Sequence, residues 1–264
     1  MRALIIGLAA AAVLGACAGG AVPGIMLAEA PAVTPQSPHI VAALADDRRP
    51  QADRERDALR HPGDVLAFTG VREGWRVADV GPGGGYYTRL FSVAVGEPGR
   101  VFAVDRPNAP DRPPRAILAV APSYPNVTVL QQGYAGWSAD EPLDAIFISQ
   151  IYHDFHLRQL NIDVPALNQE VFAALRPGGV LVIIDHAAPD GAPVGVDGAT
   201  ASHRIDRAQV VRELTAAGFV LDGESDVLRN PADDRSLRVF ESDIRGHTDQ
   251  FVLRFRRPAG GGAR

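Results

Sequence analysis

Three closely spaced glycines form the first chemically informative pattern in the chain. Residues 79–87 read Asp-Val-Gly-Pro-Gly-Gly-Gly-Tyr-Tyr, with glycine at positions 81, 83 and 85. The residues before this stretch predict a short buried strand, and those after it predict a helix. Glycine adopts positive φ and lets the backbone approach a ligand, because it has no Cβ. The pattern therefore indicates a site for a nucleotide-like ligand at the end of a first strand.

Two residues of this loop narrow the choice of ligand. The dinucleotide fingerprint Gly-x-Gly-x-x-Gly requires a glycine at position 86, where this chain has Tyr86. Asp79 suits a ligand that carries an ammonium group, whereas it would repel an anionic pyrophosphate. S-Adenosylmethionine carries both an ammonium and a sulfonium, so we expect it to be the cofactor. A nicotinamide oxidoreductase is disfavoured by Tyr86 and by the lack of a separate substrate domain.

Asp105 is the next candidate, at the end of the second predicted strand. A carboxylate at this position can accept hydrogen bonds from both ribose hydroxyls of a nucleoside. A helix cap or a loop carboxylate without a ligand is the alternative. The spacing from the glycine loop and the strand context favour ribose binding.

Strands and helices alternate through most of the chain. The predicted strands are residues 76–80, 99–105, 127–130, 143–149, 180–184, 219–222 and 251–255, and the predicted helices are 86–95, 115–120, 165–175 and 208–217. This order implies an α/β fold with a parallel sheet, helices on both faces and right-handed crossovers. Ligands of such sheets bind beyond the carboxyl ends of the strands. That edge collects residues 81–85, Asp105, 149–154 and 185–186.

The motifs resemble those of the class I S-adenosylmethionine-dependent methyltransferases, over roughly residues 60 to 256. The Asp-x-Gly-x-Gly-x-Gly loop, Asp105, residues 143–147 and residues 175–179 stand in the order of that family. More narrowly, the chain resembles a family of predicted exported bacterial methyltransferases, in segments 60–62, 152–154, 185–186, 203–206, 228–233 and 246–249. The resemblance implies a Rossmann-like sheet of seven strands, mostly parallel, with an antiparallel last strand.

One position departs from the family pattern. Many class I enzymes place an acid after the third strand, where it accepts a hydrogen bond from the adenine amine, but this chain reads Gln131-Gln132-Gly133-Tyr134. The amide oxygen of Gln132 can accept the same bond. The expected cofactor-binding residues are Asp79, Gly81, Gly83, Gly85, Tyr86, Tyr87, Asp105, Gln132 and Gln150.

Methyl transfer requires alignment of the acceptor with the sulfonium methyl and, for some acceptors, removal of a proton. Histidine is the natural base near neutral pH, and the expected catalytic residues are His153, Asp154, His186, His203 and Asp206. His153 could instead cap a helix, and Asp206 is well placed as the N-cap of helix 208–217. Arg204 could pair with Asp206 or with Asp185 and so fix its loop.

A metal site is the weaker interpretation of the same region. His153, Asp154, His156, Asp185, His186 and His203 are enough ligands in principle. No tight ligand motif such as His-Glu-x-x-His is present, and Asp–His pairs also serve as a base and its orienting group. The sequence by itself therefore predicts no metal.

The segment before the first strand is predicted to be a helical lid over the cofactor, residues 38–70. A charged helical pattern over 41–60 ends at His61-Pro62-Gly63, and a short helix follows at 64–69. Asp57, Arg60 and His61 could line the lid. The alternative is a solvated helix that packs through Leu59.

The N-terminus has the features of an export signal. Met1-Arg2 is followed by an apolar run from Ala3 to Leu14 and by Leu14-Gly15-Ala16-Cys17. The last four residues match the lipobox of bacterial lipoproteins, in which the cysteine is diacylated after cleavage; an ordinary cleaved signal is the alternative. We expect a signal at 1–17, a flexible tether at 18–37, a cofactor-binding domain at 71–257 and a disordered tail at 258–264. The expected location is the periplasm, with a lipid anchor at Cys17.

Composition and charge limit the partners. A chain of 264 residues that is 46% hydrophobic suits one globular domain, and its net charge of -5 provides no basic field for nucleic acid. We therefore expect a methyltransferase that acts on a small-molecule or lipid-associated acceptor. The alternative is an exported binding or sensing protein that has lost transferase activity, because S-adenosylmethionine is not made outside the cytoplasm.

Overall fold

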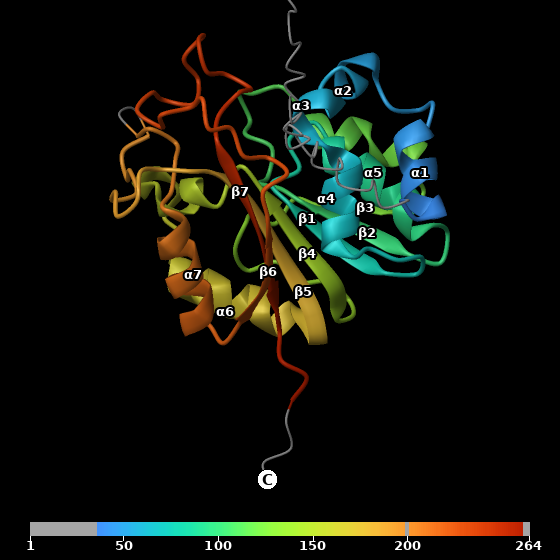
Figure 1. Cartoon of the computed structure of the whole chain (residues 1–264). Helices are drawn as coiled ribbons and strands as arrows, with labels where there is room; N and C mark the ends of the chain where they lie inside the picture. The colour runs from blue at the N-terminus through green and yellow to red at the C-terminus, as the bar shows by residue number, and fades with distance from the viewer. Residues whose placement is uncertain (1–35, 199–200, 261–264) are drawn as a thin grey trace, which may run out of the picture. The chain divides into compact units, whose positions relative to one another are not determined.

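Seven strands form one sheet in the computed structural model, which describes residues 36–198 and 201–260. The spatial order is β3-β2-β1-β4-β5-β7-β6. In chain order the strands are β1 (Arg76–Val80), β2 (Arg100–Val104), β3 (Val127–Leu130), β4 (Leu143–Ser149), β5 (Leu175–His186), β6 (Val220–Ser225) and β7 (Gln250–Arg256). Strands β1 to β5 pair in parallel, whereas β7 is antiparallel to both β5 and β6 (Figure 1). The predicted mostly parallel sheet with an antiparallel last strand is confirmed.

Alternate side chains of the strands point to opposite faces, and each face has its own helices (Figure 1). Val77 and Phe147 pack in one hydrophobic cluster with α1 (Pro38–Ala45), α4 (Pro62–Thr69) and α5 (Tyr86–Val95). Ala78 and Ile146 pack in a second cluster with α6 (Val164–Ala174) and α7 (Arg207–Ala216). Coverage of both faces explains why the central strands are almost wholly apolar.

The predicted charged helix over residues 41–60 is broken into three pieces. They are α1, α2 (Gln51–Arg54) and α3 (Asp57–Arg60). One break lies at Pro50, the N-cap of α2. Proline has no N–H to donate and disfavours helical geometry at the residue before it, so the helix does not run through this position. The alternative of a solvated helix is wrong in part, since Arg49 and Asp53 are buried. Helix α1 packs on α5 and belongs to the core, so only α2 and α3 remain as a cover for the cofactor loop.

Two further elements differ from the sequence prediction. The expected helix at 115–120 is two short 3-10 turns, η1 (Ala116–Ala119) and η2 (Ala121–Ser123). A proline within η2 limits α-helical hydrogen bonding there. Strand β5 is longer than expected at both ends. At its start Leu175 pairs with Leu143 of β4 across a register shift, and at its end His186 pairs with Gln250 of β7. Two more 3-10 turns, η3 (His153–His156) and η4 (Arg158–Leu160), follow β4.

The predicted export signal, including Cys17, lies outside the described residues. So do most of the predicted tether and the last four residues of the predicted tail. None of the helices within residues 36–198 and 201–260 combines the length and apolar character needed to cross a membrane.

Candidate active site

The glycine loop at the end of β1 requires glycine for both conformation and space. Gly81 and Gly85 have φ of 73° and 81°, in the left-handed region that favours glycine. A Cβ at Gly81 would lie 2.7 Å from the side chain of Ile151, and one at Gly85 would lie 2.7 Å from Val120. The loop therefore lies tightly against the segment after β4 and turns directly into α5, whose N-terminus it caps.

A cavity with charges of both signs lies against this loop. It is lined by Arg56, Arg60, Asp79, Gly81, Pro82, Gly83, Gly84, Tyr86, Tyr87, Ser149, Gln150, Ile151 and Asp154. Arg56 and Arg60 supply cations, and Asp79 supplies an anion. This pair of charges matches the carboxylate and ammonium of an amino acid. A second cavity, which includes Arg106, Arg112 and Arg115, also reaches Gly83. Gly83 therefore joins two cavities that together suit a long ligand with an amino-acid end.

Asp79 is buried beneath the loop. Its Oδ2 accepts a hydrogen bond of 2.6 Å from the hydroxyl of Thr88. Burial raises the pKa of Asp79 to about 6, and the hydrogen bond from Thr88 and the charge of Arg60 offset part of that rise. At neutral pH the carboxylate is therefore ionised, as an ammonium partner requires.

Asp105 has a partner that the sequence did not reveal. The guanidinium of Arg115 donates to both of its carboxylate oxygens, with Nε 2.8 Å from Oδ2, and the backbone N–H of Arg106 donates to Oδ1. Asp105 does lie at the predicted strand end, but it is buried under Arg115. Ribose hydroxyls would have to share the carboxylate with Arg115 or displace it.

Of the two glutamines after β3, the one expected to meet the adenine lies on the surface. Gln132 is exposed, and its amide oxygen lies 3.3 Å from the backbone nitrogen of Ser138. Within the described residues, the side-chain nitrogen of Gln131 is buried and has no hydrogen-bond partner. The prediction that Gln132 faces the adenine is thus not supported by its position, and Gln131 is the inward-facing donor.

Helices α2 and α3 are fastened to the glycine loop by charged and aromatic side chains. Arg49 pairs with Asp57, and the hydroxyl of Tyr86 donates to Asp57 Oδ1 over 2.6 Å. The guanidinium groups of Arg56 and Arg60 lie 4.9 and 4.8 Å from the centre of the Tyr86 ring. Arg60 also donates to Gln150, a residue with φ of 59° that lines the cavity. His61, the third predicted lid residue, lines a different cavity.

Three of the predicted catalytic residues form a cluster at the ends of β4 and β5. His153 Nδ1 lies 2.7 Å from Asp185 Oδ1, and its Nε2 lies 3.2 Å from Asp154 Oδ1. His203 Nδ1 lies 2.9 Å from the same Asp154 oxygen. Asp185 also accepts the backbone N–H groups of His153 and His186. Side chains that are 49 residues apart in sequence thus meet at one carboxylate.

The surroundings give these histidines different charges. Burial lowers the pKa of His153, but the charge of Asp185 and the hydrogen bonds to Asp154 and Asp185 outweigh it and bring the pKa to about 10. His153 is therefore a cation at neutral pH in this arrangement, which argues against its predicted role as a free base. Burial lowers the pKa of His186 to about 4, so this ring is neutral, with Nδ1 2.6 Å from the hydroxyl of Thr248.

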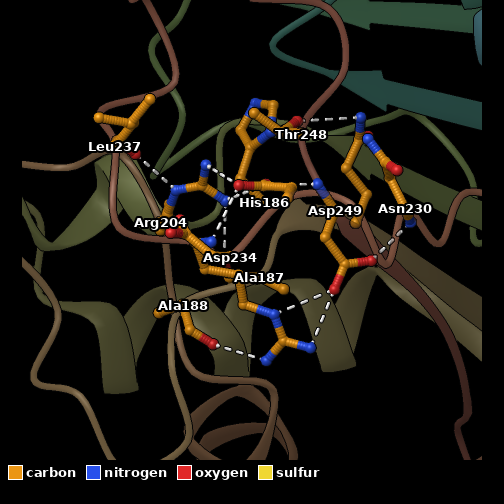
Figure 2. A network of polar contacts seen from close by, with 12 residues as sticks. His186, Ala187, Ala188, Arg204, Asn230, Asp234, Leu237, Thr248 and Asp249 are labelled. Carbon is orange, nitrogen blue, oxygen red and sulfur yellow. Dashed lines mark hydrogen bonds and ion pairs between the residues drawn. The ribbon is translucent and has the colours of Figure 1, made fainter. Parts of the chain in front are cut away.

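The loop that carries His203 is anchored by the residue that follows it. His203 has φ of 58°, which is strained for a non-glycine residue. The adjacent Arg204 is buried and donates to the carbonyls of Ala187 and Leu237 (Figure 2). It also donates to both oxygens of Asp233. Asp249 accepts from the backbone N–H of Asn230 and from the side chains of Arg229 and Arg235. Segments 203–206, 228–233 and 246–249, singled out in the sequence, thus form one polar network.

Asp206 has the structural role that the sequence left open. Its Oδ1 accepts from the backbone N–H of Ala208, and its Oδ2 accepts from that of Gly191. It is the N-cap of α7. Both oxygens are used within the loop, so the structure does not support its predicted catalytic role. Arg204 pairs with Asp233 and not with Asp206 or Asp185.

Comparisons with known proteins agree with this fold and loop. The profile of the protein-L-isoaspartate(D-aspartate) O-methyltransferase family matches residues 59–186. A ubiquinone/menaquinone biosynthesis C-methyltransferase of Yersinia enterocolitica is 30% identical over 192 residues, which cover 72% of this chain and 67% of that protein. The chain belongs to the class I S-adenosylmethionine-dependent methyltransferases.

Two other similarities agree with this family. A protein-L-isoaspartate O-methyltransferase of Methanosarcina mazei is 30% identical over 114 residues, which cover 43% of this chain and 42% of that protein. The solved structure of a methyltransferase from Aquifex aeolicus has the same fold, with a TM-score of 0.54 and 23% identity over 76% of this chain and 92% of that one. The chain thus spans under half of the Methanosarcina protein and about two thirds of the Yersinia protein.

As a class I methyltransferase, the protein uses S-adenosylmethionine as its cofactor. The residues present fit it, since the cavity at Gly83 pairs Asp79 with two arginines. The family profile covers the glycine loop, Asp105 and His153, but it ends at His186. It therefore says nothing of His203, which only the tertiary structure brings to the site.

Proposed function

We propose that this methyltransferase transfers a methyl group to a small-molecule or lipid-associated acceptor bound beside His153, Asp154 and His203. One observation carries the proposal: Asp154 belongs both to the cavity of the glycine loop and to the histidine cluster. Methyl transfer needs an acceptor within reach of both the methyl donor and a group that orients it. Asp154 is the residue that connects the two.

The cofactor would be held by residues on two sides of the glycine loop. Arg56 or Arg60 suits its carboxylate, and Asp79 suits its ammonium, because these charges line one cavity. The ribose would lie against Asp105, and the buried amide nitrogen of Gln131 could donate to a ring nitrogen of the adenine. S-Adenosylmethionine supplies an electrophilic methyl on its sulfonium. The protein must then exclude water and orient the acceptor.

The histidine cluster would orient the acceptor and receive its proton. Asp154 is ionised, since hydrogen bonds from His153 and the charges of both neighbouring rings lower its pKa despite burial. The Asp154 carboxylate, which lines the cavity, can accept a hydrogen bond from an acceptor hydroxyl or amine. We expect the acceptor to be a small polar group, presented either by a free molecule or by a lipid headgroup.

A pair of substitutions tests the two halves of the site. Asp105→Ala should weaken binding of S-adenosylmethionine by about 10- to 100-fold, because it removes the ribose acceptor. His203→Asn keeps a residue that tolerates positive φ, so it should lower turnover by about 100-fold and leave cofactor affinity unchanged. Isothermal titration measures the first effect, and transfer of labelled methyl to a panel of hydroxyl and amine acceptors measures the second.

The matched control is Asp111→Ala, which removes an exposed carboxylate from the loop after β2. It should bind the cofactor as the wild type does. Equal affinity of Asp105→Ala and wild type would place the ribose elsewhere. Full turnover by His203→Asn would remove the cluster from the reaction.

We also propose that the protein is exported to the periplasm and anchored by a lipid at Cys17. The support is the charged start at Arg2, the apolar run from Ala3 to Leu14 and the lipobox that follows. Incorporation of a labelled fatty acid into the full chain, with Cys17→Ser as the comparison, tests this. The label should appear only in the wild type, which should fractionate with membranes. A wild-type chain that takes up no label would contradict the anchor.

A further inference from the structure

Two imidazole nitrogens and one carboxylate oxygen converge beside the cavity of the glycine loop, which Asp154 lines. His153 Nε2 and His203 Nδ1 lie 3.2 and 2.9 Å from Asp154 Oδ1. One ligand atom from each of these three residues lies within 4.8 Å of those of the other two. Ligand atoms that surround a tetrahedral or octahedral ion at about 2.1 Å are roughly 3.0 to 3.5 Å apart. The 3.2 Å spacing lies in this range and the 2.9 Å spacing lies just below it, so an ion could sit between these atoms after a small side-chain adjustment.

The surroundings of His153 are those of a metal-binding histidine. Its Nδ1 is held at 2.7 Å by Asp185, which leaves Nε2 to face Asp154. Metal-ligating histidines commonly donate their second ring N–H to a carboxylate, which fixes the orientation of the ring. Asp185 is fully buried and also accepts two backbone N–H groups. The His153 ring is thus fixed by a rigid part of the fold.

His203 is positioned just as firmly. The adjacent Arg204 is fixed by a buried ion pair with Asp233. The ring of His203 also stacks edge-on against Phe240, with the ring centres 4.7 Å apart. A site whose ligands are fixed before binding loses little entropy when the ion arrives.

Asp154 is the most exposed member of the cluster. The side chain of His153 is 4% exposed and that of His203 is 11% exposed, whereas that of Asp154 is 28% exposed. Asp154 also lines the cavity of the glycine loop. An ion held by the three atoms would therefore keep free coordination positions on the side of the cavity.

We propose that His153 Nε2, Asp154 Oδ1 and His203 Nδ1 bind one divalent first-row transition-metal ion, with Asp185 as a positioning residue. Two imidazoles and one carboxylate with open positions favour zinc, iron, cobalt or manganese over magnesium and calcium, which prefer oxygen ligands alone. The ion would take the place of the protons that join these atoms through hydrogen bonds. The sequence predicted no metal, because His203 is remote along the chain and no ligand motif contains it.

The site would also restrict the methyl acceptor, and this consequence rests on the proposed function. An ion with open positions binds an oxygen or nitrogen donor and makes it more acidic. Acceptors that present a hydroxyl would thus be favoured over those that present only carbon. The binding of the ion itself does not depend on methyl transfer.

Metal titration of the purified full chain tests the site directly. After treatment with a chelator and dialysis, Co²⁺ is added while heat and visible absorption are recorded, and Zn²⁺ is then used to compete. The wild type should bind one ion per chain. Asp154→Asn and His203→Asn should each weaken binding by about 100-fold or more. His156→Gln should bind as the wild type does, because His156 pairs with Glu213 outside the cluster.

Asp185→Asn tests the positioning role, and it should weaken metal binding by about 10- to 100-fold. Circular dichroism and thermal melting establish that each variant is folded; Asp154→Asn is nearly isosteric at a partly exposed position, so it should keep the fold. The proposal is overturned if the wild type does not bind one metal ion per chain. It is also overturned if folded Asp154→Asn protein binds the ion as tightly as the wild type does. Failure of S-adenosylmethionine to bind would instead contradict the proposed function and leave the metal result unchanged.

Discussion

Three carboxylates at the same edge of the sheet, on β1, β2 and β5, differ in their partners. Asp79, at the end of β1, has a neutral partner in the hydroxyl of Thr88. Asp105, after β2, is held by the guanidinium of Arg115. Asp185, in β5, binds the ring of His153. The three carboxylates therefore suit different roles. Asp79 is available for an ammonium, Asp105 is positioned for ribose, and Asp185 orients a histidine.

At the residue scale, the raised pKa of Asp79 predicts a pH dependence of cofactor binding. Its carboxylate loses its charge as pH falls through about 6. The affinity for the cationic cofactor should therefore fall by up to about 10-fold between pH 7.5 and pH 5, because about one tenth of the group is ionised at one unit below its pKa. Isothermal titration across this range measures the effect. Asp79→Asn should bind the cofactor weakly at every pH. If its affinity changed with pH as that of the wild type does, Asp79 would not be the group that controls binding.

The raised pKa of Asp79 also makes the stability of the folded protein depend on pH. Cofactor affinity rises with pH, whereas the contribution of Asp79 to stability falls. The pKa of Asp79 in the folded protein is above its ordinary value of 3.8, so the folded state holds the proton more tightly than the unfolded state does. The contribution of Asp79 to stability is therefore lost as pH rises from about 4 to about 6. Burial of a carboxylate under the glycine loop thus costs stability at neutral pH, which a bound ammonium would offset.

At the element scale, α2 and α3 are the parts of the N-terminal region that act on the cofactor loop. Each is only one turn long, and neither would be stable alone. They are held by Asp53, which pairs with Arg89 of α5, and by Asp57, which binds Tyr86 at the start of α5. These contacts make the two turns a cover that is fastened directly to the loop they cover.

Tyr86→Phe tests this cover with the loss of one hydroxyl. It removes the hydrogen bond to Asp57 but keeps the ring on which Arg56 and Arg60 lie. One such bond contributes about 1 to 2 kcal/mol, so cofactor affinity should fall by roughly 5- to 30-fold. Hydrogen exchange of residues 51–60 should become faster, whereas that of the core strands should not change. Unchanged exchange in this segment would show that the hydroxyl does not fasten it; Tyr152→Phe, whose hydroxyl bonds Glu213 elsewhere, is the matched comparison.

At the scale of the whole molecule, Arg204 connects loops that are far apart in sequence. It joins the loop before α7 to the end of β5 and to the segment between β6 and β7 (Figure 2). A fully buried guanidinium is tolerated only with complete pairing. Arg204 has that pairing, with two bonds to Asp233 and two to backbone carbonyls.

Arg204→Met should therefore destabilise the whole protein. Loss of one partner from a buried ion pair costs about 3 to 5 kcal/mol, which lowers Tm by roughly 10 °C for a domain of this size. Urea unfolding and calorimetry measure the change. The control is Arg207→Gln, whose pair with Glu224 is exposed and contributes under about 1 kcal/mol. Equal Tm values for the two variants would contradict the anchoring role of Arg204.

Much of the sheet could be predicted from local pattern alone. The bounds of β1, β3 and β4 and of helix α5 agree with the sequence prediction. Apolar runs, glycines and prolines act through the backbone within a few residues of themselves, and a covered parallel strand leaves a continuous apolar run. The glycine loop, its strand and Asp105 therefore lie where the sequence placed them.

By itself, the sequence determined the order of the elements, the cofactor loop and the edge of the sheet on which the polar residues gather. Only the tertiary structure decided which of those residues meet. The pairing of Asp105 with Arg115, the inward position of Gln131 and the contact of His203 with Asp154 across 49 residues all depend on how loops pack. A side chain's partner is set by the distance and burial that packing creates, and no local pattern encodes that distance.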